Sequence, residues 1–231
     1  PKVSPLKGVL YIEYSMPSKH SIKQYVENSY YHIYNRGVEK RLISQDDQDY
    51  KVFLRYLKTY LEPPKPPDKI TVSINNTIFK GIPRQLNNFN NDIDLIAYCL
   101  MPNHFHLIIY QKYHKAIESF MRSLGTKYSQ YFNKKYNRVG YLFQGTYKAV
   151  MINNDAQLLH LTRYIHLNPF KETPLKDAYS SYGEYLKLRS TPWVKPKKVL
   201  DFFRSARKTS LKDVLSYQSF VEDYLHDAKE A

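Results

Sequence analysis

Residues 95–109 read LIAYCLMPNHFHLII and predict the centre of the fold. Two apolar runs flank Pro102 and Asn103, residue types that favour a turn, so the stretch predicts two strands with a turn between them. In a strand, residues i and i+2 point to the same face, so His104 and His106 project together. Imidazole is the commonest metal ligand among side chains. The pair therefore predicts half of a metal site on a central strand.

The residues alone leave open two alternatives to a metal site of this kind. Buried histidines are often hydrogen-bonded core residues, which accounts for a pair at this spacing about as well as metal binding does. A zinc site that includes Cys99 is the second alternative. Cys99 has the wrong strand parity to face both histidines, unless Pro102 and Asn103 introduce a bulge.

The charge of the chain indicates a polyanionic partner. Lys and Arg number 35 against 21 Asp and Glu, for a net charge of +14, and 23 tyrosines accompany this charge. Cations that neutralise phosphates and rings that stack on bases are typical of proteins that bind single-stranded nucleic acid. The alternatives are a soluble basic protein without such a partner and a protein that binds acidic membrane surfaces. Seven glycines and no P-loop or dinucleotide fingerprint argue against a glycine-rich phosphate loop.

The remaining composition suits a cytoplasmic protein. The 231-residue chain has one cysteine, so it forms no disulfide framework within itself and suits a reducing compartment. No apolar run approaches the roughly 20 residues of a membrane helix, and no signal-peptide pattern opens the sequence. We expect no membrane partner and a place in the cytoplasm, on the DNA of a bacterial-type nucleoid.

Periodicity predicts the elements around the histidine strand. Residues 30–36 read as a strand that ends in an Asn-Arg-Gly turn, with a return strand near residues 41–43. A helix begins at residues 44–47 and continues to Leu61 on an apolar stripe. Residues 62–92 are first proline-dense and then polar, which predicts a surface insertion with a small hairpin, outside the core. Further along, we expect a helix at 115–136, a strand within 140–151, a helix from Asn154 or Asp155 to before Pro169, and helices near 197–206 and 210–226, the last capped by Ser210.

Tyr164 and Asn168 stand four residues apart on the helix that ends before Pro169, so they share one face, with His166 roughly opposite. If that face meets the histidine strand, two imidazoles, an amide oxygen and a phenol form one site. Two histidines and one oxygen ligand leave open positions on a divalent ion for phosphate oxygens, and the phenol is then a candidate nucleophile. For any one of 23 tyrosines, a core or stacking role is the alternative.

Four segments together resemble the single-tyrosine HUH transposases, and most of all the REP-associated branch of that superfamily. In chain order they are YHIYNRG at residues 31–37, MPNHFHLI at 101–108, GYLFQG at 140–145 and YIHLNP at 164–169. Ser180-Ser181-Tyr182 and the basic helical tail also resemble that branch. The likeness covers roughly residues 28–226. The family has an arginine after the glycine that matches Gly145, where this chain has Thr146.

This resemblance implies a fold and an activity. It implies an α+β protein with a ferredoxin-like core, an antiparallel sheet with helices on one side, and a basic helical C-terminal extension. It implies metal-dependent nicking and rejoining of single-stranded DNA, often near a hairpin, through a 5′-phosphotyrosine intermediate. By motif, His104 and His106 are metal ligands, Tyr164 is the nucleophile and Asn168 is a third ligand. We expect Mg²⁺ or Mn²⁺ as the metal, single-stranded or hairpin DNA as the partner, and a homodimer or a monomer.

Charge and position suggest which residues grip the DNA, and composition suggests the domain limits. The predicted DNA contacts are Arg36, Lys134, Lys135, Arg138, Lys148 and Arg163. The predicted domains are an N-terminal extension at 1–27, a catalytic domain at 28–184 with the insertion at 62–92, and a basic helical extension at 185–231. Two other functions stay open: a DNA-binding regulator that does not nick, and a metal-dependent nuclease that uses activated water instead of Tyr164.

Overall fold

The structure is a computed structural model, and it describes residues 25–66, 69–75, 77–82, 85–171, 173–206 and 216–230. Its centre is a four-stranded sheet in the order β4-β5-β1-β6, in which all neighbouring strands are antiparallel. The strands are β1 (Ser29–Arg36), β4 (Ile93–Leu100), β5 (His104–Gln111) and β6 (Lys148–Ile152).

Two helices complete a ferredoxin-like core. Helix α1 (Asp47–Leu61) connects β1 to the β4–β5 pair, and α2 (Ala116–Lys135) connects β5 to β6. Asp46 caps α1 by accepting a hydrogen bond from the backbone N–H of Asp49, as expected for an acidic first turn. The chain order strand–helix–strand–strand–helix–strand, with this strand order, confirms the predicted α+β core.

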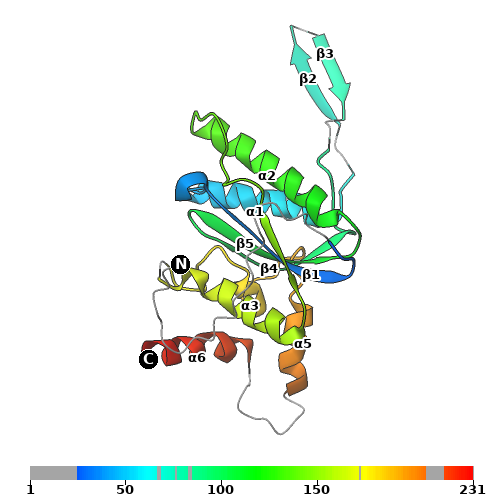
Figure 1. The fold of residues 1–231 in the computed structure, drawn as a ribbon. Helices are drawn as coiled ribbons and strands as arrows, with labels where there is room; N and C mark the ends of the chain where they lie inside the picture. Colours follow the sequence, from blue (N-terminus) through cyan, green and yellow to red (C-terminus); the bar gives the residue numbers. More distant parts are fainter. Residues whose placement is uncertain are drawn as a thin grey trace.

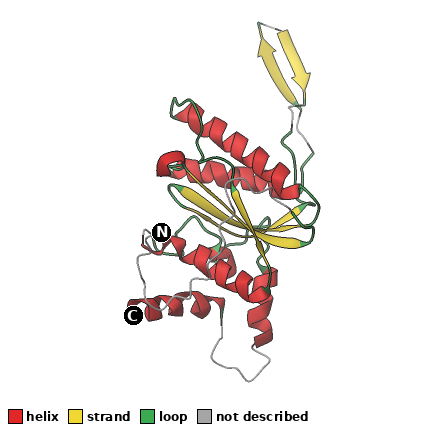
Figure 2. Cartoon of the chain, in the orientation of Figure 1, coloured by secondary structure: helices red, strands yellow, loops and turns green. Residues whose placement is uncertain are grey.

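Helices cover both faces of the sheet (Figures 1 and 2). The face that carries Ile33, Phe105 and Leu107 packs against α1 and α2 in one apolar cluster. The opposite face packs against α3 (Asp155–Leu167) and, around it, α4 (Tyr182–Tyr185), α5 (Lys197–Ala206) and α6 (Tyr217–Glu230). The prediction of helices on one side therefore describes α1 and α2 alone. The second face is covered too because Ala97, Cys99 and Ile108 make it apolar, and apolar surface is stabilised by removal from water.

The basic C-terminal segment is part of this second layer. Val199, Phe203, Tyr217 and Val221 are buried in the cluster that includes α3. The predicted limit between residues 184 and 185 falls inside α4, and residues 1–24 and 207–215, including Ser210, lie outside the described part of the chain. Helix α6 begins at Tyr217 among the described residues, later than predicted. The proposed domain limits stay predictions.

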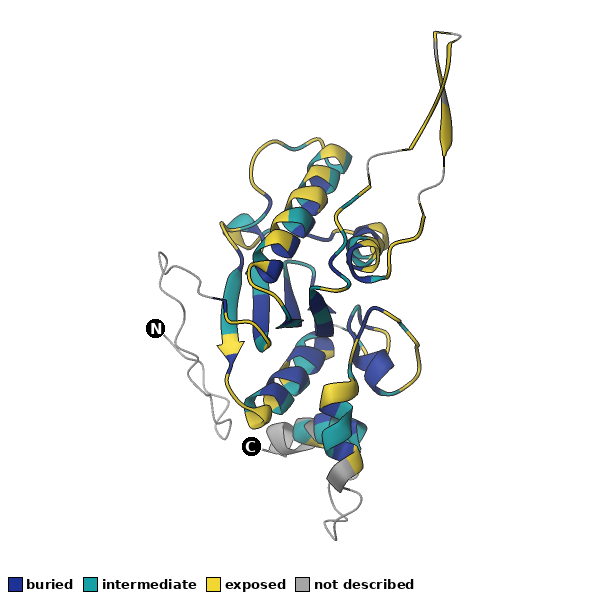
Figure 3. Cartoon of the chain, turned by 90° about the vertical axis from the view of Figure 1, so that its right-hand side faces the viewer, coloured by how far each residue is buried: buried dark blue, intermediate teal, exposed yellow. Residues whose placement is uncertain are grey.

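The insertion after α1 contains the predicted hairpin. Strands β2 (Ile70–Ile74) and β3 (Thr77–Gly81) pair only with each other and project from the body (Figures 1 and 3). The prediction that all of 62–92 lies outside the core is wrong at Phe89, which is buried and packs edge-on against Tyr60 and Phe120. An aromatic ring of this size stabilises the fold far more when buried than when exposed.

Residues 41–43 do not form the predicted return strand. A short 3₁₀ turn at Val38–Lys40 follows β1, and the backbone N–H groups of Ile43 and Ser44 both donate to the Pro102 carbonyl. These bonds tie the segment before α1 to the β4–β5 turn. The backbone N–H groups of Ile43 and Ser44 are therefore not available to pair with a neighbouring strand. In the described part of the chain, no helix is long and apolar enough to cross a membrane.

Candidate active site

A polar patch occupies one end of the sheet on the face toward α3. In β1 the buried side chains of Tyr31 and Ile33 face α1 and α2, so His32, Tyr34 and Arg36 point to the other face. The antiparallel register sets Tyr34 opposite His106 and Arg36 opposite His104. Residues directly opposite each other share a face. Two strands therefore bring these polar side chains together.

The ring of His106 forms a hydrogen bond with the ring of His32. The two rings are buried, and Nδ1 of His106 lies 2.8 Å from Nε2 of His32. Burial lowers the pKa of His32 to about 3 and, with the nearby histidines, holds the pKa of His106 well below its usual value. Both rings are therefore neutral near pH 7. When His106 Nδ1–H donates to His32, Nε2 of His106 carries the lone pair that a metal ligand needs.

His104 is oriented by Asn103 and faces Asn168. Nδ1 of His104 lies 2.6 Å from Oδ1 of Asn103, and because an amide oxygen can only accept, the imidazole donates here. Nε2 of a neutral His104 is then an acceptor, and it lies 3.2 Å from Oδ1 of Asn168. Two acceptors that face each other at this distance are stabilised by a cation between them. This arrangement fits a metal site.

Helix α3 brings Tyr164 and Asn168 to the patch. Asn154 caps the helix by accepting from the backbone N–H of Gln157, and the helix ends at Leu167, two residues before Pro169. The Tyr164 ring stands edge-on to His106, with centroids 5.7 Å apart, and 53% of its surface stays exposed. Burial raises the pKa of Tyr34, and Tyr164 adds to that rise, which also places the two phenols close together.

His166, two residues after Tyr164, serves a different purpose. Its ring is fully buried on the side of α3 away from the histidine pair, and burial lowers its pKa to about 3. Nδ1 lies 2.7 Å from the hydroxyl of Tyr217, and Nε2 lies 2.8 Å from Oγ of Ser181. His166 thus joins α3 to α6 and to the segment before α4.

The predicted ligand set converges in the structure. His104, His106 and Asn168 offer two imidazole nitrogens and an amide oxygen, a mixed set that suits a divalent cation with open positions for phosphate. Within the described residues, no group of three or more His, Cys, Asp or Glu side chains could hold a metal ion, so the set of His104, His106 and the Asn168 amide stays a prediction.

Because no group of three or more His, Cys, Asp or Glu side chains in the described part of the chain could hold a metal ion, the zinc alternative with Cys99 and both histidines gains no support. Cys99 lies opposite His106 in the register and therefore on the same face, which corrects the parity argument. Strand parity does not carry through the turn at residues 101–103, because the pairing of the two strands decides which residues face each other. The thiol is fully buried in the apolar cluster under α3.

The loop at residues 140–145 lies against the end of β1. Arg36 Nε donates to Oε1 of Gln144, and the Gln144 backbone N–H donates to the Arg36 carbonyl at 2.8 Å. Asn35 Nδ2 donates to the Gly145 carbonyl at 3.2 Å. Gly145 has φ +72°, which glycine adopts without strain. These bonds bring the first and third sequence motifs beside the histidine pair.

The predicted DNA-contact residues divide into two groups. Lys148 lies opposite Tyr34 in the register, so Lys148 and Arg36 share the face of the histidine pair. Lys134 is exposed at the end of α2, and Arg138 follows it with a hydrogen bond to Asn133 at 3.1 Å. These four side chains stay predicted DNA contacts.

Lys135 and Arg163 have structural partners. The Lys135 ammonium lies 2.7 Å from Asp46 and 2.8 Å from the fully buried Asp49, which ties the end of α2 to the start of α1. The Arg163 guanidinium lies 4.6 Å from the ring centre of Phe220 and 4.1 Å from that of Tyr224, both on α6. The contacts give both side chains roles in packing, and their binding to DNA stays a prediction.

Three residues of the patch were not predicted as functional: His32, Tyr34 and Asn103. The first two carry a readable signal, because the order Tyr31-His32-Ile33-Tyr34 alternates and Arg36 continues the polar side. Asn103 looks like an ordinary turn residue, and only its bond to His104 reveals its role.

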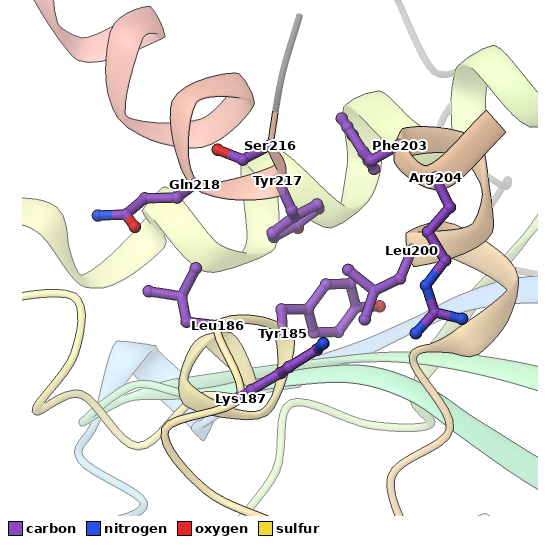
Figure 4. A pocket seen from close by; sticks show the side chains of 9 residues that line it. All are labelled: Tyr185, Leu186, Lys187, Leu200, Phe203, Arg204, Ser216, Tyr217 and Gln218. Atoms are coloured by element: carbon purple, nitrogen blue, oxygen red, sulfur yellow. The ribbon is translucent and has the colours of Figure 1, made fainter. Parts of the chain in front are cut away.

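A cavity of about 220 Å³ lies elsewhere, between α4, α5 and α6 (Figure 4). Tyr185, Phe203 and Tyr217 are among its lining residues, together with Lys187 and Arg204. It shares no residue with the histidine patch.

Fold and site together define an α+β protein that holds a histidine pair on a central strand against a tyrosine on a facing helix. The family model described as "Transposase IS200 like" matches residues 72–168, a range that contains His104, His106, Tyr164 and Asn168. This match confirms the expected resemblance to the single-tyrosine transposases. No curated protein sequence matches the chain significantly.

Two solved structures match this chain. One is a REP-associated tyrosine transposase bound to a REP hairpin, with TM-score 0.50, 13% identity, and coverage of 76% of this chain and 96% of that chain. The other is a putative transposase from Deinococcus radiodurans R1, with TM-score 0.35, 16% identity, and coverage of 63% and 95%. At this level of identity, the first likeness shows that the fold is shared.

Proposed function

We propose that this protein nicks and rejoins single-stranded DNA through a covalent bond between Tyr164 and a 5′ phosphate. The observation that supports this best is the convergence of Tyr164, His104, His106 and Asn168 on one polar patch. The likeness to IS200-like transposases over this part of the chain supports the same class of chemistry.

The phenol of Tyr164 is the nucleophile in this proposal. Its oxygen forms a bond to phosphorus while the bond from phosphorus to the 3′ oxygen breaks. The phenol loses its proton, and the 3′ oxygen takes up a proton and leaves as a hydroxyl. The phosphotyrosine is still a phosphodiester, so a 3′ hydroxyl of another strand reverses the step and becomes joined.

His104, His106 and Asn168 would hold a divalent cation, Mg²⁺ or Mn²⁺. Such a cation, when bound, makes the scissile phosphorus more electrophilic and stabilises the leaving 3′ oxygen. Asn103 and His32 occupy Nδ1 of the two imidazoles, so each ring keeps Nε2 for a ligand role. A free phenol has a pKa of ~10 and is a weak nucleophile, so its position beside the phosphate matters.

The proposed substrate is single-stranded DNA next to a hairpin. Arg36 and Lys148 lie on the face of the histidine pair, where they would neutralise phosphates near the reacting bond. A related fold has been solved with a REP hairpin bound. A folded strand offers a duplex for shape and unpaired bases for reading.

The test is an adduct assay with labelled DNA that carries a hairpin and a single-stranded flank. The protein is incubated with Mg²⁺ or Mn²⁺ and run on a denaturing gel. We expect a protein–DNA adduct that needs the metal and disappears in Tyr164→Phe. Tyr113→Phe is the matched control, because Tyr113 is 58% exposed, follows the end of β5 away from His104, and loses the same hydroxyl.

Each other outcome points to a different function. Tight binding without adduct or cleavage, on a broad panel of hairpins, would make the protein a DNA-binding regulator. Metal-dependent cleavage that persists in Tyr164→Phe without an adduct would indicate a nuclease that uses activated water. An adduct that persists in Tyr164→Phe would mean that another residue is the nucleophile.

A further inference from the structure

The hairpin of β2 and β3 is an arm that stands away from the body (Figures 1 and 3). Every residue of β3 is exposed, including Ile78 at 66% and Phe79 at 53%. Isolated two-stranded hairpins are only marginally stable in water, and exposed apolar groups on such an element often mark a contact surface.

The base of the arm is fixed. Asn88 Nδ2 donates to the carbonyl of Glu62 at 2.7 Å, which joins the outgoing and returning legs. The Phe89 backbone N–H donates to the Tyr60 carbonyl at 2.7 Å, and its ring is buried in the core. Pro63, Pro64 and Pro66 stiffen the outgoing leg, because proline favours an extended conformation. The arm therefore leaves the body from a defined place.

The chemistry of the arm favours a polyanion. From residue 69 to residue 91 the sequence has no Asp or Glu, while it has Lys69, Lys80 and Arg84. The register sets Thr71 opposite Lys80 and Ser73 opposite Ile78, so one face of the hairpin carries two hydroxyls, an ammonium and an aliphatic group. All four side chains are exposed.

We propose that this face, made of Thr71, Ser73, Ile78 and Lys80, binds the duplex stem of a DNA hairpin. A two-stranded ribbon fits the major groove of B-DNA, which is roughly 12 Å wide. The hydroxyls contact base edges, the Ile78 side chain packs against thymine methyl groups, and Lys80 neutralises a phosphate. This inference rests on the proposed function for the choice of DNA, and it adds a duplex contact separate from the nicking site.

The position of the arm sets a minimum length for the stem. Helix α1 begins beside Pro102, close to the histidine pair, and the arm follows its far end. A helix of 15 residues is about 22 Å long. At 3.4 Å per base pair, about seven base pairs are needed to span that distance. Only a stem at least this long reaches from the nicking site to the arm.

The test compares two labelled hairpins, with stems of 12 and 3 base pairs, that carry the same single-stranded flank. Binding is measured by fluorescence anisotropy without metal. In one variant, two glycines replace residues 70–81, whose ends are paired and therefore adjacent. We expect this variant to bind the long stem about tenfold more weakly or worse, and the short stem within about twofold of the unchanged chain.

Lys80→Gln tests the phosphate contact without removal of the arm. Loss of one phosphate contact should reduce the slope of log affinity against log salt by about 1 for the long stem. Lys127→Gln is the matched control, because Lys127 is an exposed lysine on α2. That variant should leave the preference for the long stem unchanged.

An equal loss on both stems, or no loss on either, would overturn the proposal. A change from dimer to monomer in the variant without the arm, with DNA binding intact, would make the arm a contact between copies of this chain and would also overturn it. The adduct assay is read separately. If the unchanged chain forms no adduct but the arm still discriminates stem length, the proposed function fails and the duplex contact stands.

Discussion

The two faces of the central strands differ in what they do. On β1 and β5, Ile33, Phe105 and Leu107 point toward α1 and α2 and are almost fully buried in the core. Their neighbours in sequence, including Tyr34 and His104, point the other way and meet the end of α3. The alternation of side chains on one pair of strands thus separates the residues of the core from those of the proposed site. Two residues that follow each other on β5, His104 and Phe105, therefore lie in different surroundings, the polar patch and the apolar core.

The largest effect on activity is expected for His104→Ala, which tests whether the face toward α3 carries the proposed site. The substitution removes a proposed metal ligand that is only half-buried, so we expect the protein to fold normally. Adduct formation should fall by at least about 10³-fold, roughly 4 kcal/mol in transition-state stabilisation. The rate is measured on a denaturing gel, and the melting temperature should move little. Retention of a tenth of the rate would exclude His104 as a ligand.

The neighbouring change, Phe105→Ala, should do the reverse. The Phe105 ring packs against Phe53 and Phe143, with centroids 5.3 Å and 5.8 Å away, and its loss leaves a cavity. We expect a loss of about 3–4 kcal/mol in the free energy of unfolding, measured with urea. At urea concentrations well below the midpoint of unfolding of the variant, the folded protein should form the adduct at the rate of the unchanged chain. A lost rate in the folded protein would show that the two faces are not separate.

A smaller effect is expected at His32, whose ring contacts the proposed ligand His106. His32→Phe keeps a ring but removes the acceptor for His106 Nδ1, so the orientation and basicity of His106 suffer. The metal concentration for half-maximal adduct formation should rise by about 10–100-fold. His32→Gln restores an acceptor and should recover much of the affinity. Equal behaviour of the two variants would mean that His32 only fills space.

The smallest effect belongs to the α1–α2 side, at Asp49. Burial raises the pKa of Asp49, but hydrogen bonds from Lys135, the Gln45 backbone, Tyr136 and Tyr131 outweigh it and hold the pKa below its usual value. Such a carboxylate contributes stability above its unfolded pKa, near 3.8, and this contribution is lost as the pH falls through the folded value.

Asp49→Asn should therefore destabilise the protein by about 1.5 kcal/mol at pH 7, with a difference that shrinks below pH 4. The free energy of unfolding, measured by urea titration at several pH values, reports this. A difference that stays constant down to the lowest pH would show that the charge of Asp49 does not matter.

The sequence predicted the strands and helices around the histidine pair well, because the limits of such elements depend on local periodicity. The strand limits around His104 and the limits of the helix that carries Tyr164 were foreseen within a few residues. The two wrong predictions of local structure have a common cause. Phe89, in a polar stretch, and the predicted strand at residues 41–43 were decided by partners distant in sequence, namely Phe120 and the Pro102 carbonyl.

By itself, the sequence determined which residues share a face: His104 with His106 by strand alternation, and Tyr164 with Asn168 by helix periodicity. Whether the strand face and the helix face meet was decided only by tertiary structure, because α3 packs where the second face of the sheet is apolar. Tertiary structure also decided that His32 contacts His106. It decided as well that Lys135 pairs with Asp49 and that Arg163 lies over an aromatic ring of α6. Periodicity is local, whereas contact between elements depends on how the whole chain buries its apolar surface.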